Sequence, residues 1–428
     1  MKKSIKNLFL TLSILYALSG LGACGVSHSD DNTDTSNSFV ESPSESIESF
    51  DSSSSSQKKY SINLTAFYGG DEVSLLSEGY SDYLAITDEK EAANYLYINS
   101  GKSFDYCNSI TLRWEKTDSS YISKYTVHLA TDSNFSNEKT IETGYVPAIR
   151  LDNLMPGQTY YWKISDSKDI ESEVGCFRTK NETVRAISVE GVSNMRDLGG
   201  WSTGAGKKVK YGMIYRSGLL DEMTAKGKEV FFNDLKIKSE IDVRQEATKS
   251  VFGDDINFVY AGIMQMCYIY PQFSQTTPTK RQFDEKSPQG LKNAFEALAD
   301  INTYPVVVHC SAGADRTGTF SFLLNGLLGV SYEDIIKDFE LTSFSRYGKR
   351  WRSAIVRGED NTLSFDESGI MQDNSGNYVA LGKLYNMMME HYGTEDGTLA
   401  SACENYLISV CNVSKDSIDK IRDILVEQ

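Results

Sequence analysis

The sequence predicts a multidomain protein in which a β-sandwich precedes an α/β domain with a central, mostly parallel sheet flanked by helices. Up to about Lys180, apolar and polar residues alternate with the period of a strand, as in residues 110–114 and 124–129, and turn-rich segments separate these runs. After Lys180, short apolar runs such as 304–308 alternate with helical patterns. This alternation is typical of a parallel sheet covered by helices.

The composition indicates a chain that folds over most of its 428 residues, with 40% hydrophobic and 24% charged residues. The net charge of -16 argues against nucleic-acid binding, because that requires clustered Lys and Arg. None of the four histidines has metal-ligand spacing to another His or Cys, so we expect no metal site. The cysteine chemistry inferred below needs no organic cofactor either. Seven cysteines in this length do not make a disulfide scaffold.

The N-terminus carries a targeting signal. Three lysines precede an apolar run over residues 8–18, which is too short to span a bilayer as a helix. The run leads into Leu-Gly-Ala-Cys ending at Cys24, which resembles the lipobox of bacterial lipoproteins. The resemblance implies that residues 1–23 are a signal peptide and that lipid on Cys24 anchors the protein to the extracellular face of the membrane. The alternative is a plain secretory signal in which Cys24 is incidental.

Residues 24–59 form a separate polar segment. They are rich in Ser, Asp, Glu and Asn, and include five consecutive serines at 52–56. Such a segment has too little apolar surface to offset the entropy lost on ordering, so we expect a flexible, negatively charged stalk.

The predicted β-sandwich spans residues 60–180. Trp114 on an early strand, and Tyr160 after a Leu-x-Pro turn, are similar to the core Trp and the tyrosine corner of fibronectin type III domains. The resemblance is good over residues 108–180 and poor over 60–107. It implies a spacer or binding domain with no chemistry attached, in which both aromatic side chains pack in the core.

The pairing of the cysteines outside the N-terminal segment is left open. Cys107 and Cys176 flank the predicted sandwich and could form a disulfide in an oxidising exterior, but sequence does not give their separation. Cys403 and Cys411 lie near the C-terminus, and no partner is predicted for either.

Residues 181–428 are predicted to fold as the α/β domain. Thr224 is a candidate N-cap, because its side chain can accept a hydrogen bond from the first turn of the helix that follows. The predicted strands lie at 240–243 and 304–308, and the predicted helices include 224–235 and 290–298.

One loop of this domain carries the chemistry. Its residues, HCSAGADRTG starting at His309, follow a buried strand and precede an apolar helix at 319–328. A strand–loop–helix junction directs several backbone N–H groups toward one point at a helix N-terminus, which makes an anion site. Cys310 at its start is expected to be a thiolate at neutral pH, since helix N-termini favour that form. Arg316 presents a planar pair of donors to two phosphate oxygens.

The Cys-x5-Arg spacing in this loop resembles the signature loop of protein tyrosine and dual-specificity phosphatases. The resemblance implies that Cys310 attacks phosphorus and forms a phosphocysteine, while Arg316 holds the phosphate. His309 is expected to orient the loop. The alternative is a buried, inert cysteine beside a surface arginine. The resemblance also assigns phosphate binding to Ser311, Ala312, Gly313, Ala314 and Thr317; the Thr317 hydroxyl either helps the thiolate leave or caps the helix.

Further motifs narrow the resemblance to a bacterial family of tyrosine and lipid phosphatases. That family usually carries a Lys before the loop Asp, where this chain has Ala314. Because the Lys is associated with binding of phosphoinositide headgroups, its absence lowers the expectation of lipid phosphatase activity. The matching motifs are NMRDLGG at 194–200, YRSG at 215–218, IDVR at 241–244 and GVSYEDI at 329–335, within a match that runs from about residue 185 to 418.

Two carboxyl groups are candidates for the general acid, because no Trp-Pro-Asp loop precedes the Cys-x5-Arg loop. The resemblance makes Asp315 the first candidate, and a loop-bracing role is its alternative. Asp284, on a polar loop upstream, is the second candidate. Asp242 and Arg244 lie at a strand end where sites form in parallel sheets, and they either bind phosphate or form a structural ion pair.

A basic cluster follows the apolar helix. It is either a solvated face or an attractor of anionic substrates, and its members are Arg346, Lys349, Arg350 and Arg352.

These patterns predict a cysteine-dependent phosphatase at the cell surface that hydrolyses phosphate monoesters, with phosphotyrosine or dual-specificity protein substrates favoured over small phosphate esters. One alternative is a phytase-like inositol phosphate or phosphoinositide phosphatase. Another is an inactive adhesion lipoprotein that binds phosphorylated ligands.

Overall fold

The computed structural model describes residues 61–247, 249–263, 286–348, 350, 354–357, 363–366, 370–373, 376–379 and 381–427. All of them belong to one compact unit, Lys59–Gln428. The predicted signal peptide, Cys24 and the stalk lie outside the described residues, as do Asp284, Lys349 and Arg352. None of the described helices combines the length and the apolar character needed to cross a membrane.

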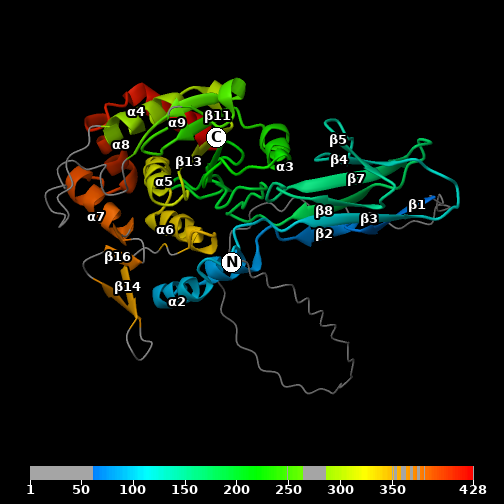
Figure 1. Ribbon diagram of the computed structural model, residues 1–428, viewed down its shortest axis with the longest axis horizontal. Coiled ribbons are helices and arrows are strands. Elements are labelled where there is room, and N and C mark those ends of the chain that lie inside the picture. The colour runs from blue at the N-terminus through cyan, green and yellow to red at the C-terminus, as the bar shows by residue number, and fades with distance from the viewer. Residues whose placement is uncertain are drawn as a thin grey trace, which may run out of the picture. The chain divides into compact units, whose positions relative to one another are not determined.

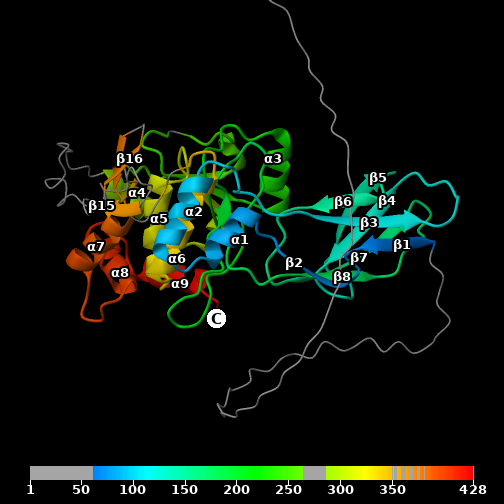
Figure 2. The ribbon, with the colours of Figure 1, turned by 90° about the horizontal axis from the view of Figure 1, so that it is seen from below.

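Two sheets between residues 62 and 179 share one hydrophobic core (Figures 1 and 2). Trp114 and Tyr160 lie in this core, as predicted, and the Met155 N–H donates to the Tyr160 hydroxyl at 2.9 Å. The fibronectin type III assignment stays a prediction. One sheet has the order β1 (Ile62–Ala66), β3 (Ile110–Lys116), β6 (Ala148–Leu151); the other has the order β2 (Gly69–Val73), β8 (Gly175–Thr179), β7 (Thr159–Asp166), β4 (Tyr125–Ala130), β5 (Lys139–Gly144).

The expectation of β-structure throughout residues 60–107 is wrong for two helices, α1 (Glu78–Ala85) and α2 (Glu89–Asn99). Ser77 and Asp88 cap these helices, since their side chains accept from backbone N–H groups of the first turns. Each helix is short, so packing decides its formation more than propensity does. Their buried side chains belong to the core of the α/β domain rather than to the core of the two sheets.

The disulfide considered for Cys107 and Cys176 is not formed, because both are free thiols. Cys107 is buried, and its Sγ lies 3.2 Å from Asn153 Oδ1 and 3.3 Å from Ser188 Oγ. These polar contacts explain how a buried thiol is accommodated without a disulfide partner.

The central sheet of the α/β domain is mostly parallel, as predicted. Four of its five strands run parallel to one another, and only β9 at one edge is antiparallel. The order is β12 (Asn257–Tyr260), β11 (Ser239–Asp242), β13 (Val306–His309), β10 (Ile214–Ser217), β9 (Arg196–Asp197). The central position of β13 explains its all-apolar run before His309, because both of its faces are covered.

Helices cover both faces of this sheet (Figure 1). Val306 and Val308 pack in the larger core with α4 and α5, while Val307 faces a smaller cluster around Phe231 and Phe252. The helices are α3 (Ala225–Glu229), continued by a π-helical turn (Val230–Asp234), α4 (Lys286–Leu298), α5 (Asp315–Leu327), α6 (Tyr332–Glu340), α7 (Leu381–Tyr392), α8 (Leu399–Ser409) and α9 (Lys415–Leu425).

Short elements complete the described chain. They are 3-10 turns at Gly253–Asp255, Ile301–Thr303 and η6 (Leu341–Phe344), and two strand pairs, β14 (Ala354–Arg357) with β15 (Leu363–Asp366) and β16 (Ile370–Asp373) with β17 (Gly376–Val379). The predicted helices at 224–235 and 290–298 are confirmed, and Thr224 caps α3 as expected.

Candidate active site

The predicted phosphate loop lies between the end of β13 and the start of α5. Gly313 has φ +64, and a Cβ at this residue would come within 2.4 Å of the Ser217 carbonyl oxygen at the end of β10. Only glycine meets both conditions, because its backbone adopts positive φ without strain and it has no Cβ. The Leu219 N–H donates to the Ser311 carbonyl at 3.2 Å, which ties the loop to the segment after β10.

Cys310 and Arg316 occupy opposite ends of this loop. Cys310 is 2% exposed and packs against the larger core. Arg316 Nη2 donates to Ser311 Oγ at 3.2 Å on the exposed side, so its guanidinium folds back over the loop. The loop therefore has a buried sulfur at its base and a half-buried cation at its rim, in the order that the sequence predicts.

Two buried side chains hold the loop from behind. Asn194 Nδ2 donates to the Ala312 and Gly313 carbonyls at 2.9 and 3.1 Å, and Arg216 Nη2 donates to the Gly313 carbonyl at 2.7 Å. In a trans peptide the N–H points opposite to the C=O. Carbonyls held from behind therefore turn the N–H groups of Gly313 and Ala314 toward the inside of the loop, where they can bind an anion.

Asp338 on α6 joins the two buried arginines behind the loop. Its carboxylate accepts from Arg196 Nε at 2.8 Å and from Arg216 Nη1. Burial alone would raise the pKa of the Asp338 carboxyl, but the two arginines outweigh burial and lower it. The carboxylate is therefore ionised and orients both guanidinium groups.

The same group of charges leaves an excess of positive charge near the sulfur. Burial, together with Arg196, lowers the pKa of Arg216 to about 10, while the charges of Asp338 and Cys310 oppose this shift. Arg216 therefore stays cationic at neutral pH. Two buried arginines with one shared carboxylate leave net positive charge behind the loop, which favours the binding of an anion such as phosphate.

His309 is buried and oriented by a carboxylate that sequence analysis did not identify. His309 Nε2 lies 2.9 Å from Glu240 Oε1 and 3.7 Å from Asp242 Oδ2. The other Glu240 oxygen accepts from the Ser250 hydroxyl. This geometry supports the expected structural role of His309. In the described part of the chain, Glu240, Asp242 and His309 are also grouped closely enough to hold a metal, but each is buried and already engaged.

Asp242 and Arg244 form an ion pair, which was one of the two interpretations of these residues. Arg244 Nε and Nη2 donate to Asp242 Oδ2 at 2.8 and 2.6 Å, and Arg244 Nη1 lies 3.1 Å from Asp221. The pKa of Arg244 is raised, chiefly by the hydrogen bonds to Asp242. Asp242 is fully buried, so the structure favours the ion pair over direct phosphate binding by this carboxylate.

Asp315 is the first residue of α5 and is held by Arg350. Arg350 Nε and Nη2 donate to the two Asp315 oxygens, each at 2.9 Å. The Arg350 side chain is mostly buried, whereas 22% of the Asp315 side chain is exposed. The Arg350–Asp315 contact is the one expected if Asp315 braces the loop. Because part of the Asp315 carboxylate is exposed, it can also reach a substrate as a general acid would.

The expected basic cluster after α5 is not a uniform solvated face. Arg346 donates to Glu222 Oε2 at 2.8 Å and stacks on the Tyr347 ring, and Arg350 is engaged by Asp315. The remaining two members, Lys349 and Arg352, lie outside the described residues.

The helix-cap alternative for Thr317 is wrong. The N-cap of α5 is Ala314, which has no side chain able to accept a hydrogen bond. The Thr317 hydroxyl is fully buried and has no hydrogen-bond partner among the residues that the structure describes. A buried hydroxyl without a hydrogen-bond partner costs free energy. The Thr317 hydroxyl can recover this free energy by hydrogen bonding to a group that enters the loop.

Several residues that support the loop were missed by sequence reasoning. Asn194, Arg196 and Arg216 lay in motifs that matched the family, but the motifs gave them no role. Asp338 lies three residues after Ile335, on the face where the amphipathic helix α6 carries its apolar residues, which marks it as a candidate for burial but says nothing of its partners. Glu240 had none, since a single acid in a short strand is ordinary.

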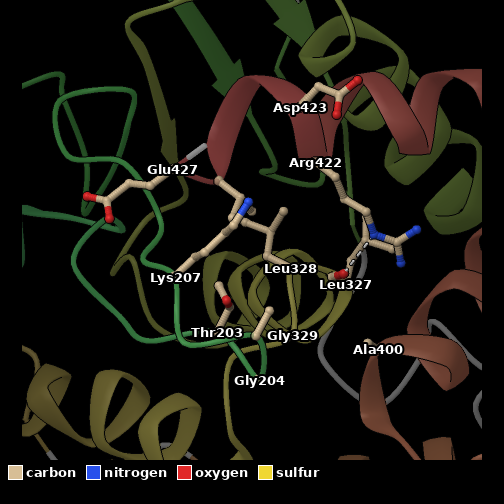
Figure 3. Close-up of a pocket in the computed structure, with 12 residues that line it drawn as sticks. Thr203, Gly204, Lys207, Leu327, Leu328, Gly329, Ala400, Arg422, Asp423 and Glu427 are labelled. Carbon is tan, nitrogen blue, oxygen red and sulfur yellow. Dashed lines mark hydrogen bonds between the residues drawn. The ribbon is translucent and has the colours of Figure 1, made fainter. Parts of the chain in front are cut away.

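A separate cavity of about 390 Å³ lies at the other end of α5 (Figure 3). It is lined by Leu327 to Gly329, Thr203 and Arg422, and Arg422 Nε donates to the Leu327 carbonyl at 3.3 Å. α5 has 13 residues, so this cavity lies about 20 Å from the loop along the helix axis. It does not belong to the candidate active site.

Comparison with known proteins gives a family for the domain that carries this loop. Residues 187–427 match the sequence profile described as "Tyrosine phosphatase family". A Cupriavidus necator protein provisionally named a tyrosine-protein phosphatase is 29% identical over 186 residues, which cover 40% of this chain and 67% of that protein. A similarly named protein of Meyerozyma guilliermondii is 26% identical over 152 residues, covering 34% of this chain and 76% of its own.

Among solved structures, the catalytic domain of the PP-IP phosphatase Siw14 from S. cerevisiae, in complex with citrate, is similar at 18% identity and a TM-score of 0.26. The similarity covers 37% of this chain and 80% of that one.

Proposed function

The chain belongs to the tyrosine phosphatase family and is a phosphoric monoester hydrolase, and from this premise we propose that it hydrolyses phosphotyrosine or dual-specificity protein substrates through a phosphocysteine intermediate. One observation carries the proposal. Cys310 lies at the base of a loop whose carbonyls are held from behind by Asn194 and Arg216, and Arg316 folds over its rim.

In the proposed mechanism, the Cys310 sulfur attacks phosphorus in line with the leaving oxygen. The S–P bond forms as the P–O bond breaks, while Arg316 and the loop N–H groups hold the three equatorial oxygens. Asp315 gives its proton to the leaving oxygen. Water then attacks the phosphocysteine, Asp315 takes back one proton, and inorganic phosphate leaves as the thiolate re-forms, with help from the Thr317 hydroxyl.

The proposed acid role requires a change in the Asp315–Arg350 contact. A carboxylate with two hydrogen bonds from a guanidinium is stabilised in its charged form, whereas an acid must hold a proton. We propose that an incoming phosphate, which also attracts Arg350, loosens this pair. The alternative role for Asp315 is a brace for the start of α5.

The phytase-like alternative is less well supported. Ala314 is fully buried and supplies no cation where relatives that bind inositol headgroups carry a lysine. The net charge of -16 also repels a ligand with many phosphates. A loop built around one phosphate, in an acidic protein, favours a substrate with a single phosphate group.

Substrate preference tests the proposed function. We expect kcat/KM for a phosphotyrosine peptide to exceed that for inositol hexakisphosphate by at least about tenfold, because only the former presents one dianion on a flat leaving group. The measurement is phosphate release at equal substrate concentrations, with a phosphoserine peptide as a third substrate. A higher value for inositol hexakisphosphate would establish the phytase-like alternative. Phosphate binding without turnover would establish the inactive ligand-binding protein.

We also propose that the enzyme acts at the extracellular face of the membrane, anchored through lipid on Cys24. The lipobox-like residues at the end of the N-terminal apolar run support this location. In cells that make the full chain, Cys24→Ser is expected to move the protein from the membrane fraction to the soluble or secreted fraction. Unchanged membrane association of this variant would contradict the lipid anchor.

A further inference from the structure

Asp105 contacts the support of the loop from outside the family-matched residues 187–427. Its Oδ2 accepts from the Ser193 hydroxyl at 2.7 Å and from the Asn194 N–H at 2.5 Å. Asn194 is fully buried, and its side-chain amide is the group that holds the Ala312 and Gly313 carbonyls. A chain of hydrogen bonds therefore runs from Asp105 to the predicted phosphate-binding loop.

The segment that presents Asp105 is fixed to the α/β domain. The Gly101 and Phe104 N–H groups donate to the Ser343 and Phe344 carbonyls of η6 at 2.7 and 2.9 Å. The Ser77 hydroxyl, just before α1, donates to the Phe104 carbonyl at 2.6 Å. These bonds hold the backbone just before Asp105, and just after it the Cys107 N–H donates to Ser188 Oγ at 3.2 Å. The Asp105 carboxylate is therefore a fixed acceptor rather than a mobile surface group.

Aromatic packing anchors the same segment. The Phe344 ring lies 5.6 Å from the Tyr80 and Tyr83 rings and 6.1 Å from the Tyr95 and Phe104 rings, measured between centroids. The helices α1 and α2 supply three of these rings, and the Tyr83 hydroxyl of α1 also donates to the Glu340 carboxylate of α6. Burial of several aromatic side chains makes this a stable attachment.

We propose that Asp105 is a positioning residue of the phosphatase, and that the chain from α1 to Asp105 is an integral part of the catalytic unit. This inference rests on the proposed function. Asp105 fixes the backbone at Asn194, which orients the Asn194 amide and thereby the two carbonyls of the loop. Arg196 Nη1 also donates to the Asn194 Oδ1, so the part that Asp105 plays is to fix the backbone that carries the amide. Without the carboxylate this backbone can shift, the amide shifts with it, and the N–H groups of the loop lose their common direction.

Two substitutions of Asp105 in the otherwise intact chain separate hydrogen bonding from charge. Asp105→Ala removes both hydrogen bonds and is expected to lower kcat for p-nitrophenyl phosphate about ten- to hundredfold, as small misplacements in active sites do. The affinity for vanadate, which mimics the transition state, is expected to weaken by a similar factor. Asp105→Asn is expected to restore most of the activity, because both bonds use a single oxygen that an amide oxygen can replace.

The control is Asp152→Asn. Asp152 lines the same cavity of about 690 Å³ as Asp105 and Ser193, but its carboxylate accepts from Arg150, whereas that of Asp105 accepts from Ser193 and Asn194. It is expected to change kcat by less than about twofold, as surface substitutions away from a site do. A double-mutant cycle with Asn194→Ala adds a second check. If Asp105 acts through Asn194, the double variant is no slower than Asn194→Ala alone.

The outcomes distinguish this inference from the proposed function and from a folding defect. No turnover by the unmodified protein would overturn the proposed function itself. An active protein in which Asp105→Ala matches Asp152→Asn would overturn the role of Asp105 alone. If Asp105→Ala only destabilises the fold, fewer molecules are active, but the folded ones bind vanadate with unchanged affinity. Reduced activity with unchanged vanadate affinity would therefore also overturn the positioning role.

Discussion

Cys310→Ser is expected to lower kcat for phosphotyrosine and p-nitrophenyl phosphate by more than about 10⁴-fold, as removal of a covalent nucleophile does in other enzymes. A serine hydroxyl fits the same buried position but is not ionised at neutral pH, so it cannot attack phosphorus. The loop carbonyls and the arginines behind them are untouched by the change. The variant is therefore expected to keep its fold and its ability to bind phosphate or vanadate.

Cys403 and Cys411, the other cysteines of the domain among its described residues, do not compete for this role. Burial raises the pKa of the Cys403 thiol well above its ordinary range and that of Cys411 to about 12, so both stay protonated at neutral pH. Cys176→Ser is a suitable control, because Cys176 is half-buried on β8, in the sheet that precedes the α/β domain. Hydrolysis by Cys310→Ser at even a tenth of the unmodified rate, with an unchanged melting temperature, would exclude the phosphocysteine mechanism.

Asp315→Asn is expected to lower kcat for substrates with a poor leaving group by about 10²–10⁴-fold, the usual contribution of a general acid. An amide cannot donate a proton to the leaving oxygen. Esters of strongly acidic phenols leave without protonation, so their hydrolysis is expected to change little.

The leaving-group dependence separates the acid from the brace. If Asp315 only holds the start of α5 through Arg350, both classes of ester should slow by the same factor, and Arg350→Gln should reproduce the effect. Asp334→Asn provides the control, because Asp334 also lies in the first turn of a helix, α6, and contacts no residue of the loop. Equal slowing of both ester classes in Asp315→Asn would show that Asp315 is not the general acid. Asp284 would then be the next carboxyl to test.

The predicted loop, the strand before it and the helix after it could be obtained from sequence because their determinants are contiguous. The apolar run 305–308, the ten residues from His309 and the apolar helix after them lie within one short segment, and local periodicity and turn chemistry define each part. The spacing of the cysteine at the start of the loop and the arginine six residues later is enough to identify both as candidate site residues. The same reasoning failed at residues 78–99, where short helices with few apolar residues form because they pack on η6.

The sequence by itself determined a cysteine and an arginine on a loop between a buried strand and a helix, and hence the class of chemistry. Only the tertiary structure decided what holds that loop. Its supporting contacts join residues far apart in the chain: 122 positions for Arg216 and Asp338, 89 for Asn194 and Asp105, and 69 for His309 and Glu240. Such pairs leave no local pattern, because a buried charge is satisfied by whichever partner the packing of distant elements brings within reach.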